Sequence, residues 1–164
     1  DVAIRVGRFE DPTLVTRRLA PCRMVLCASP EYLKKHGTPE TPDDLSRAPR
    51  LAFSQAVSAG DWTIYDAQGR PHSIEGPCRM TANNIQLLLE SVLAGTGIAY
   101  GPNFVFGEHI KQGKLIKLLP AYRTTELTIQ AVYPSAIRIP FKVRSFVDFI
   151  AKALGDTPLW GEEN

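Results

Sequence analysis

The segment at residues 81–102 limits the possible folds more than any other part of this chain. Its first half carries apolar residues at helical spacing, which predicts a helix with one buried and one solvated face. These apolar residues are Ile85, Leu88, Leu89, Val92 and Leu93. Asn83 and Asn84 precede them, and an Asn side chain at a helix start accepts hydrogen bonds from the free amides of the first turn. The segment therefore predicts a helix that begins just after this pair.

The glycines after the helix mark its end and the start of a strand. Gly95 and Gly97 supply the left-handed backbone on which many helices end. A strand is expected at residues 98–100, and another at 79–81 before the helix, so the segment predicts a β-α-β unit. Because Gly95, Gly97 and Gly101 follow a helix instead of opening one, helix capping is favoured over a phosphate-binding loop. Helix starts in such units point toward a ligand crevice.

Strands and helices alternate along the rest of the chain, which predicts an α/β fold with a mainly parallel sheet. Pro21 is expected to separate residues 14–20 from a strand at 23–28, and a hairpin around the turn at 66–69 is expected to add an antiparallel edge. Further strands are expected at 1–6, 50–54, 114–119 and 126–133, and helices at 31–36, 43–48, 103–113 and 140–154. The last helix places one apolar stripe on Val143, Phe146, Val147, Ile150 and Leu154.

Composition excludes several classes of protein. A chain of 164 residues is the size of one ordinary domain and buries a sizeable core. Its hydrophobic fraction of 44% and charged fraction of 22% are typical of globular proteins. A net charge of +2 is too small to indicate binding to nucleic acid or a membrane. No apolar run approaches the roughly 20 residues that cross a bilayer. Free cysteines suit a reducing cytosol, so we expect a cytoplasmic protein.

Residues that support enzyme chemistry are not arranged for it. His36, His72 and His109 have no histidine or cysteine at metal-ligand spacing, so surface roles are expected. Ser29 stands between Ala28 and Pro30, where a nucleophile elbow needs glycine, and an N-cap role is favoured. We therefore predict no catalytic residue, no metal, no cofactor and no enzyme activity.

The cysteines are expected to be unpaired. Cys22, Cys27 and Cys78 are odd in number and show no metal or redox spacing. Buried or half-buried free thiols are favoured over a disulfide or a reactive site.

Binding is the remaining class of function. Several polar residues follow expected strands or lie in them, where α/β crevices collect ligands. They are Arg5, Ser54, Gln55, Asn83, Asn84 and Tyr100. Each also has a structural alternative, capping for the asparagines and packing for Tyr100.

An ordered set of motifs resembles the effector-binding domain of LysR-type transcriptional regulators. The motifs are DVAIRVG at 1–7, VLCASPEYL at 25–33, GTP at 37–39, PDDL at 42–45, the asparagine pair at 83–84, LAGTGIA at 93–99, GKL at 113–115, LP at 119–120, AVYPS at 131–135 and PFKVRSFVDF at 140–149. The resemblance covers nearly the whole chain in the expected order. It implies a periplasmic-binding-protein-like (type 2) α/β fold of two lobes, with a small-molecule effector in the cleft between them.

The resemblance also implies a division of the chain. Residues 1–21 and 120–154 would form part of the first lobe, residues 22–119 the second lobe, and residues 155–164 a loose tail. Because the chain opens directly on a strand, we expect an N-terminal part to have been removed, so that one lobe is incomplete. The winged helix-turn-helix through which the family binds DNA would be in that part.

Carried onto this sequence, the cleft residues of the family would come from both lobes. They would be Arg5, Val6, Phe53, Ser54, Gln55, Asn83, Asn84, Tyr100, Gly101 and Pro102. Arg5 together with amides at a helix start suits a small carboxylate as effector. The implied function is ligand sensing in a bacterial transcription regulator that self-associates as a homodimer or tetramer. The alternative is a solute-binding protein of a transport system with the same fold.

Overall fold

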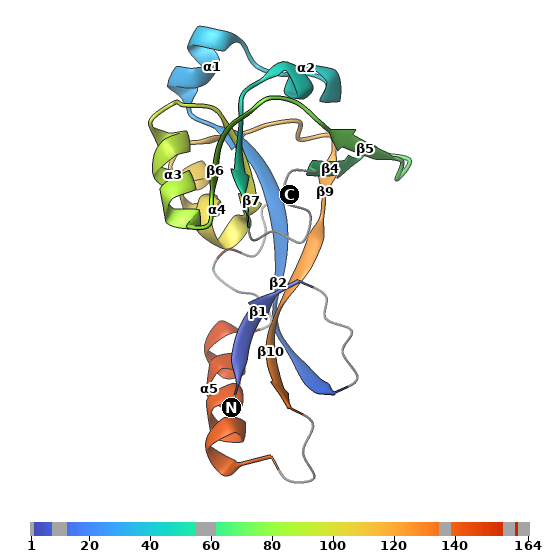
Figure 1. Cartoon of the computed structure of the whole chain (residues 1–164), viewed down its shortest axis with the longest axis vertical. Helices are drawn as coiled ribbons and strands as arrows, with labels where there is room; N and C mark the ends of the chain where they lie inside the picture. The colour runs from blue at the N-terminus through green and yellow to red at the C-terminus, as the bar shows by residue number, and fades with distance from the viewer. Residues whose placement is uncertain (1, 8–12, 55–61, 135–138, 156–159, 161–164) are drawn as a thin grey trace. The chain divides into compact units, whose positions relative to one another are not determined.

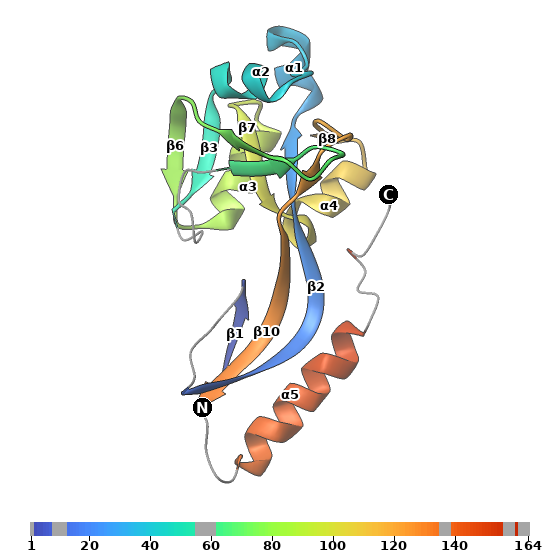
Figure 2. The same cartoon turned by 90° about the vertical axis from the view of Figure 1, so that its right-hand side faces the viewer.

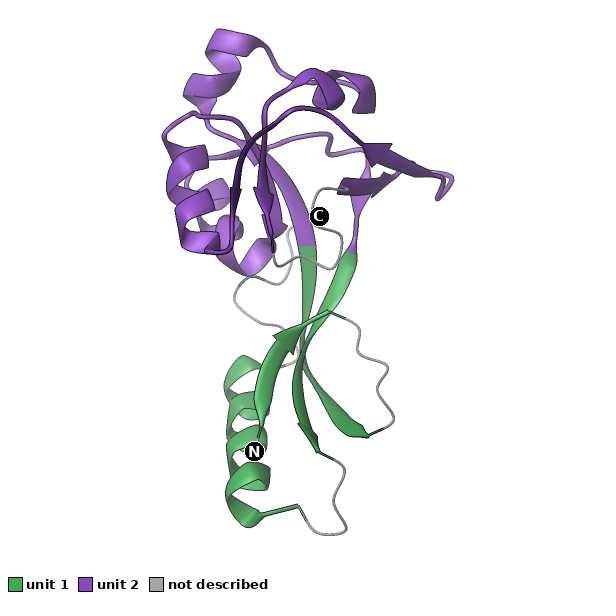
Figure 3. Ribbon diagram, viewed as in Figure 1, with its two compact units in different colours: residues 1–23, 126–164 green, residues 24–125 purple. Residues whose placement is uncertain are grey.

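The structure is a computed structural model that describes residues 2–7, 13–54, 62–134, 139–155 and 160 (Figure 1). The chain divides into two compact units, Asp1–Arg23 with Glu126–Asn164 (unit 1) and Met24–Thr125 (unit 2) (Figure 3). The sequence placed these boundaries after residues 21 and 119. The second boundary lies later because strand β9 (Arg123–Thr124) pairs with β4 (Trp62–Tyr65) of unit 2.

Unit 1 is an antiparallel sheet with one helix packed on it. Its strands are β1 (Ala3–Val6), β10 (Glu126–Pro134) and the first part of β2 (Leu14–Ala28), in the order β1-β10-β2. Helix α5 (Phe141–Leu154) covers one face of this sheet (Figure 2). Val143 and Val147 are buried against Leu19, Ala20 and Ala131. The predicted stripe is wrong at Phe146, which is 42% exposed.

Unit 2 is built on a sheet with helices on one face and a mixed layer on the other. The sheet contains the second part of β2 with β7 (Ile98–Pro102), β3 (Arg50–Phe53) and β6 (Cys78–Ala82), in that order. The short strand β8 (Ile116–Lys117) also pairs with β2. The strand expected at 114–119 is therefore shorter than predicted. The helices are α1 (Pro30–His36), α2 (Pro42–Arg47), α3 (Ile85–Leu93) and α4 (Asn103–Lys111).

Successive side chains along each strand of this sheet point to opposite faces. Val25 and Cys27 of β2 face the cluster that contains α3 and α4, whereas Leu26 and Ala28 face the opposite cluster. That second cluster buries residues of α1, α2 and a small separate sheet with the order β5-β4-β9, in which β5 is Pro71–Ile74. Both faces are therefore covered, as α/β sheets require.

A buried arginine joins the small sheet to the main one. Arg50, the first residue of β3, donates to the Ile74 carbonyl at 2.8 Å and to the Gly76 carbonyl at 2.7 Å. Its guanidinium also lies over the ring of Trp62, 5.3 Å from the centroid. These contacts compensate the cost of burying a charged group.

Two expectations about the sheet are wrong. The main sheet is mixed, because only β3 pairs in parallel, with β6 and β7, whereas the described pairs of β1, β2 and β10 are antiparallel. Pro21 does not interrupt the chain but lies inside β2. Pro21 pairs with Thr128 of β10, and the described pairs with β7 begin only at Met24. In this stretch one edge of β2 is unpaired, so the missing N–H of proline breaks no hydrogen bond of the sheet.

Most local predictions are confirmed, but of the two glycines expected to be left-handed after α3 only Gly95 has a positive φ, of 71°. Ser29 caps α1 by accepting from the Tyr32 N–H at 3.2 Å, with Pro30 at the first helical position. The hairpin turn closes with the Gly69 N–H donating to the Asp66 carbonyl at 2.9 Å, and Gly69 has a positive φ of 79°. Within the described residues, no helix has the length and hydropathy that crossing a bilayer requires.

Candidate functional site

The carboxyl ends of three neighbouring strands meet at one edge of the unit 2 sheet. β3 lies between β6 and β7 and runs parallel to both. Phe53, the last residue of β3, pairs with Ala82, the last residue of β6. The Ser54 N–H then donates to the Ala82 carbonyl at 2.9 Å. Pairing therefore places Phe53 and Ser54 beside the segment that leads to Asn83 and Asn84.

β7 ends at the same edge. Arg50 pairs with Ile98 and the strands run in one direction, so Gly101 and Pro102 lie beside the end of β3. Gly101 is buried, and a Cβ there would lie 2.1 Å from Cε2 of Phe106. The close approach of α4 to β7 thus requires glycine at this position.

The two asparagines before α3 differ in role. Asn84 is the N-cap, and its Oδ1 accepts from the N–H groups of Gln86 at 2.9 Å and Leu87 at 3.4 Å. Asn83 precedes the cap and is exposed. The predicted cap is therefore confirmed for Asn84, and the Asn83 side chain is left at the surface beside Ser54.

Helix α4 begins at this edge without a side-chain cap. Pro102 stands at its N-cap position and makes no side-chain hydrogen bond there. Asn103, the first residue of α4, is buried although it is polar. Asn103 directly follows strand β7, just as Ser54 follows β3 and Asn83 follows β6. This position is the sequence signal that marks Asn103 as a further candidate, and the sequence analysis did not include it.

Tyr100 has a different environment from the other candidates. Its ring is buried and lies 5.6 Å from the Trp62 ring, centroid to centroid. Its hydroxyl donates to the Thr63 carbonyl at 3.0 Å and accepts from the Thr125 N–H at 3.1 Å. Burial raises the pKa of this phenol, and the hydrogen bonds with Thr125 lower it by less. The side chain therefore connects β7 to the small sheet.

The remaining candidates belong to unit 1 or fall outside the described residues. Arg5 and Val6 belong to β1 of unit 1, opposite Gln130 and Ile129 of β10, and both are exposed. Gln55 lies outside the described residues.

The three histidines are at least partly exposed, as the sequence predicts. His72 Nε2 lies 3.4 Å from Asp66 Oδ2, and the His36 ring stacks on Tyr32. Within the described residues, no three histidine, cysteine or acidic side chains are grouped as a metal site. All three cysteines are unpaired, and burial raises the pKa of Cys27 to about 12. Cys78 differs from the expectation because it is exposed.

Known proteins match the chain over almost all of its length. The LysR substrate binding domain family matches residues 1–155. The HTH-type transcriptional regulator CrgA of Neisseria meningitidis serogroup C is 38% identical over 158 residues, which cover 95% of this chain and 52% of CrgA. The HTH-type transcriptional regulator DmlR of Escherichia coli K12 is 34% identical over 151 residues, which cover 92% of this chain and 48% of DmlR. The chain thus spans about half the length of the curated relatives it matches.

Solved structures give the same result for the fold. The structure of CrgA from Neisseria meningitidis matches with a TM-score of 0.82 and 35% identity, over 95% of this chain and 53% of that one. The regulatory domain of AphB from Vibrio vulnificus matches with a TM-score of 0.78 and 28% identity, over 93% of this chain and 75% of that one. The predicted periplasmic-binding-protein-like α/β fold is confirmed. This chain belongs to the family of LysR substrate binding domains.

Proposed function

We propose that this chain senses a small molecule for a bacterial LysR-type transcription regulator. The observation that supports this most directly is the meeting of β3, β6 and β7 at one sheet edge, which brings Ser54, Asn83 and the start of α4 together. Ligands of α/β proteins bind at such edges, outside the carboxyl ends of parallel strands. The wall of the proposed site consists of Phe53, Gly101 and Pro102. Tyr100 holds the end of β7 in place through its buried ring and its hydrogen bonds to Thr63 and Thr125.

The effector that suits this edge is a small carboxylate. Helix α4 begins at this edge, and the partial positive charge of a helix start favours an anion. Ser54 and Asn83 add neutral hydrogen-bond donors, and both are exposed. We propose Arg5, Val6 and Gln55 as further residues that bind the effector. Arg5 contributes the charge that pairs with the carboxylate.

Regulation by such a site requires that the effector binds two states of the regulator with different affinity. We propose that effector binding changes the arrangement of a homodimer or tetramer in the cytoplasm. DNA would be contacted by a helix-turn-helix domain outside this chain, as the names of the relatives indicate for those proteins. The chain itself would bind neither DNA nor a membrane and would catalyse no reaction. The transport-type alternative is not favoured, because the matching proteins are named as transcriptional regulators.

The test combines identification of the ligand with two matched variants. Native mass spectrometry of the intact regulator that carries this chain should recover a small organic acid. In a promoter–reporter assay, Asn83→Ala and Ser54→Ala should reduce the response to that acid while thermal stability stays unchanged. Glu90→Ala, at an exposed position further along α3, serves as the control.

Asn84→Ala separates capping from binding. This variant should melt lower, because loss of an N-cap costs about 1 kcal/mol. If Asn83→Ala and Ser54→Ala respond like the parent regulator, the effector does not bind at this edge. Recovery of only neutral apolar compounds would contradict the carboxylate.

A further inference from the structure

Unit 2 contains an open pocket between the end of helix α1 and helix α2. Its volume is about 410 Å³, and it is lined by Tyr32, by residues 36–40, and by parts of α2 with the two residues that follow it. The last of these, Pro49, directly precedes β3, whereas the proposed effector site lies beyond Phe53, the last residue of that strand. The pocket is therefore at the opposite end of β3 from the effector site.

The walls of the pocket carry apolar surface that water reaches. Pro39, Ala48 and Pro49 are half-buried, and His36 is exposed. The His36 ring stacks on the buried ring of Tyr32, with the centroids 4.6 Å apart and the planes inclined by 26°. Because this apolar surface is exposed in the free protein, a ligand that covers it gains hydrophobic free energy.

Three charged side chains also line the pocket. They are Glu40, Asp44 and Arg47. Asp44 Oδ2 accepts from the Thr41 hydroxyl at 2.8 Å and from the Glu40 N–H at 3.2 Å, within the cap of α2. Among the described residues, neither the Glu40 carboxylate nor the Arg47 guanidinium makes a hydrogen bond or an ion pair. One negative and one positive group of the pocket are thus available to a ligand.

Asp44 places these two groups close together. Its carboxylate contacts the backbone of Glu40, and Arg47 follows it by three residues in α2, a spacing at which helix side chains are neighbours. Hydrogen bonds from Thr41 and Glu40, and to a lesser degree the charge of Arg47, hold the pKa of Asp44 below its ordinary value. Opposite charges therefore line one cavity, each beside Asp44.

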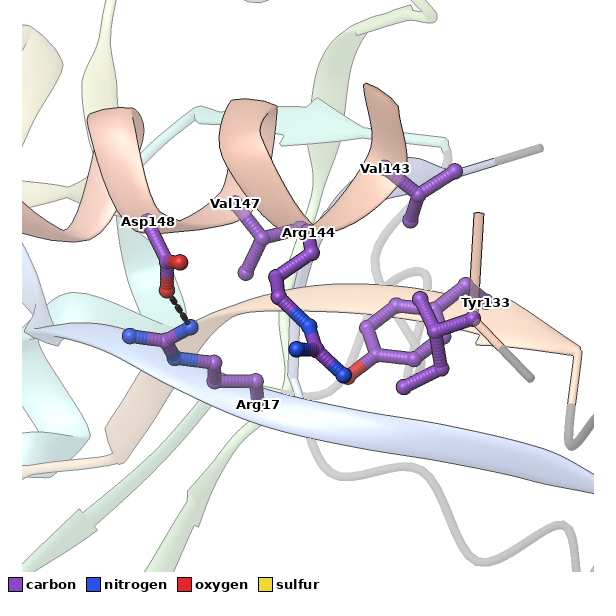
Figure 4. A pocket seen from close by; sticks show the side chains of 7 residues that line it. Arg17, Tyr133, Val143, Arg144, Val147 and Asp148 are labelled. Atoms are coloured by element: carbon purple, nitrogen blue, oxygen red, sulfur yellow. Dashed lines mark hydrogen bonds and ion pairs between the residues drawn. The ribbon is translucent and has the colours of Figure 1, made fainter. Parts of the chain in front are cut away.

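The pocket of unit 1 differs in both respects. Its volume is about 280 Å³, and in it Arg17 and Asp148 form an ion pair with each other (Figure 4). Val143 and Val147 on its wall are 4% and 2% exposed, so they offer a ligand almost no apolar surface. The combination of exposed apolar surface with unpaired charges of both signs belongs to the unit 2 pocket.

We propose that the unit 2 pocket binds an amino acid with an apolar side chain. Arg47 pairs with the carboxylate through the parallel N–H groups of its guanidinium, and Glu40 pairs with the ammonium. The side chain of the ligand lies against His36 and the prolines. The volume is within the range of about 300 to 1,000 Å³ for small-molecule sites. The proposal does not depend on the function proposed for Ser54 and Asn83.

Ligands with only part of this chemistry fit the pocket less well. An organic acid of the same shape would leave Glu40 without a partner, and an amine would leave Arg47 without one. An amino acid that lacks a side chain would leave the ring of His36 and the prolines in water. Affinity should therefore depend on all three parts of the ligand.

The probe for the test is L-phenylalanine, titrated into this chain to about 10 mM and followed by amide NMR, since exposed ion pairs suit a weak site. Binding should shift the amide signals of Gly37, Thr38 and Ala48, which line the pocket. The amide signals of Ser54 and Asn83 should stay unchanged.

Two variants test the charged groups. Arg47→Gln and Glu40→Gln should each weaken binding by about threefold or more, because each removes one exposed ion pair with the ligand. Neither should change the thermal melt, since neither side chain makes a hydrogen bond within the described residues. Lys35→Gln and Glu31→Gln are the matched controls, because both residues are exposed on α1 and do not line the pocket.

Three further ligands test the specificity. Hydrocinnamate lacks the ammonium, phenethylamine lacks the carboxylate, and glycine lacks the side chain, so each should bind at least about threefold more weakly than L-phenylalanine. In Arg47→Gln, the advantage of L-phenylalanine over phenethylamine should disappear. In Glu40→Gln, its advantage over hydrocinnamate should disappear.

Several results would overturn the proposal. They are an absence of shifts at the lining amides, parent-like binding by Arg47→Gln or Glu40→Gln, equal binding of any of the three other ligands, and an equal loss of binding in the control variants. Shifts confined to Ser54 and Asn83 would also overturn it, and would instead support binding of the amino acid at the effector site.

Discussion

The hydroxyl oxygen of Tyr100 and the backbone nitrogen of Thr125 lie 3.1 Å apart, in a hydrogen bond between residues 25 positions apart in the sequence. The same hydroxyl donates to the Thr63 carbonyl at 3.0 Å. Through these two bonds, β7 of the main sheet is joined to β4 of the small sheet and to the point where the chain leaves unit 2. Tyr100 is thus a structural neighbour of the proposed site.

Tyr100→Phe should lower the free energy of unfolding by about 1 to 3 kcal/mol. The variant keeps the packing against Trp62 but removes the hydroxyl that bonds the part-buried Thr63 carbonyl and Thr125 N–H, and losing such bonds costs about this much. Urea unfolding measures the change. Tyr65→Phe, at a less buried tyrosine, should change stability by less than about 0.5 kcal/mol. Equal stability of Tyr100→Phe and the parent would show that these hydrogen bonds contribute nothing net.

Gly101→Ala should destabilise the protein, whereas Gly107→Ala should stabilise it. A Cβ at Gly101 would lie 2.1 Å from Cε2 of Phe106, a fully buried ring, and overpacking of this kind costs about 1 to 3 kcal/mol. A Cβ at Gly107 in α4 meets no atom within 4 Å, and Ala is favoured over Gly in helices by about 1 kcal/mol. Thermal melts of the two variants should therefore shift in opposite directions, and shifts of the same sign would contradict this account.

Arg50→Lys should destabilise the protein although it keeps the charge. A lysine ammonium is a compact point charge and cannot reach the Ile74 and Gly76 carbonyls in the geometry of the guanidinium fork. We expect a loss of about 1 to 3 kcal/mol in urea unfolding. Arg47→Lys, at an exposed position in α2, is the matched control and should change little. If both variants lose a similar free energy of unfolding, the hydrogen bonds of Arg50 to the two carbonyls do not explain the effect.

Asp66 should make the free energy of unfolding fall as the solution becomes acidic. Desolvation raises its pKa, but hydrogen bonds from the Arg70 backbone, the Arg70 side chain and His72 outweigh this and hold the pKa at about 2. An unfolded aspartate has a pKa near 3.9, so the folded state is stabilised above that pH and loses the contribution as pH falls from roughly 4 to 2. In Asp66→Asn, the midpoint of urea unfolding should fall less over this window than in the parent chain. An equal fall in both proteins would rule out Asp66 as a source of the acid sensitivity.

Local features of this protein were predictable because they depend on residues close together in the sequence. The Asn84 cap, the Ser29 cap with Pro30, and the turn from Asp66 to Gly69 each form within a few residues. Side-chain oxygens that reach nearby amides, and a glycine that accepts positive φ, determine these structures whatever lies around them. The ordered motifs of the LysR family added the fold.

The pairing of distant segments was not predictable in the same way. β2 continues through Pro21 because β10, more than a hundred residues later, pairs beside it. The hairpin of β4 and β5 lies in a separate sheet because β9 completes it. Long-range pairing depends on which apolar faces bury each other, and periodicity along one segment does not contain that information.

The sequence alone thus determined the family, the helices with their caps, and the polar residues that end the strands of unit 2. Only the tertiary structure placed Tyr100 in the core by bonding its hydroxyl to Thr63 and Thr125. It also brought Arg17, Tyr133 and Arg144 around one pocket. The physical reason is the same in both cases, because the partners of these side chains come from strands and helices that meet only when the sheets and the core assemble.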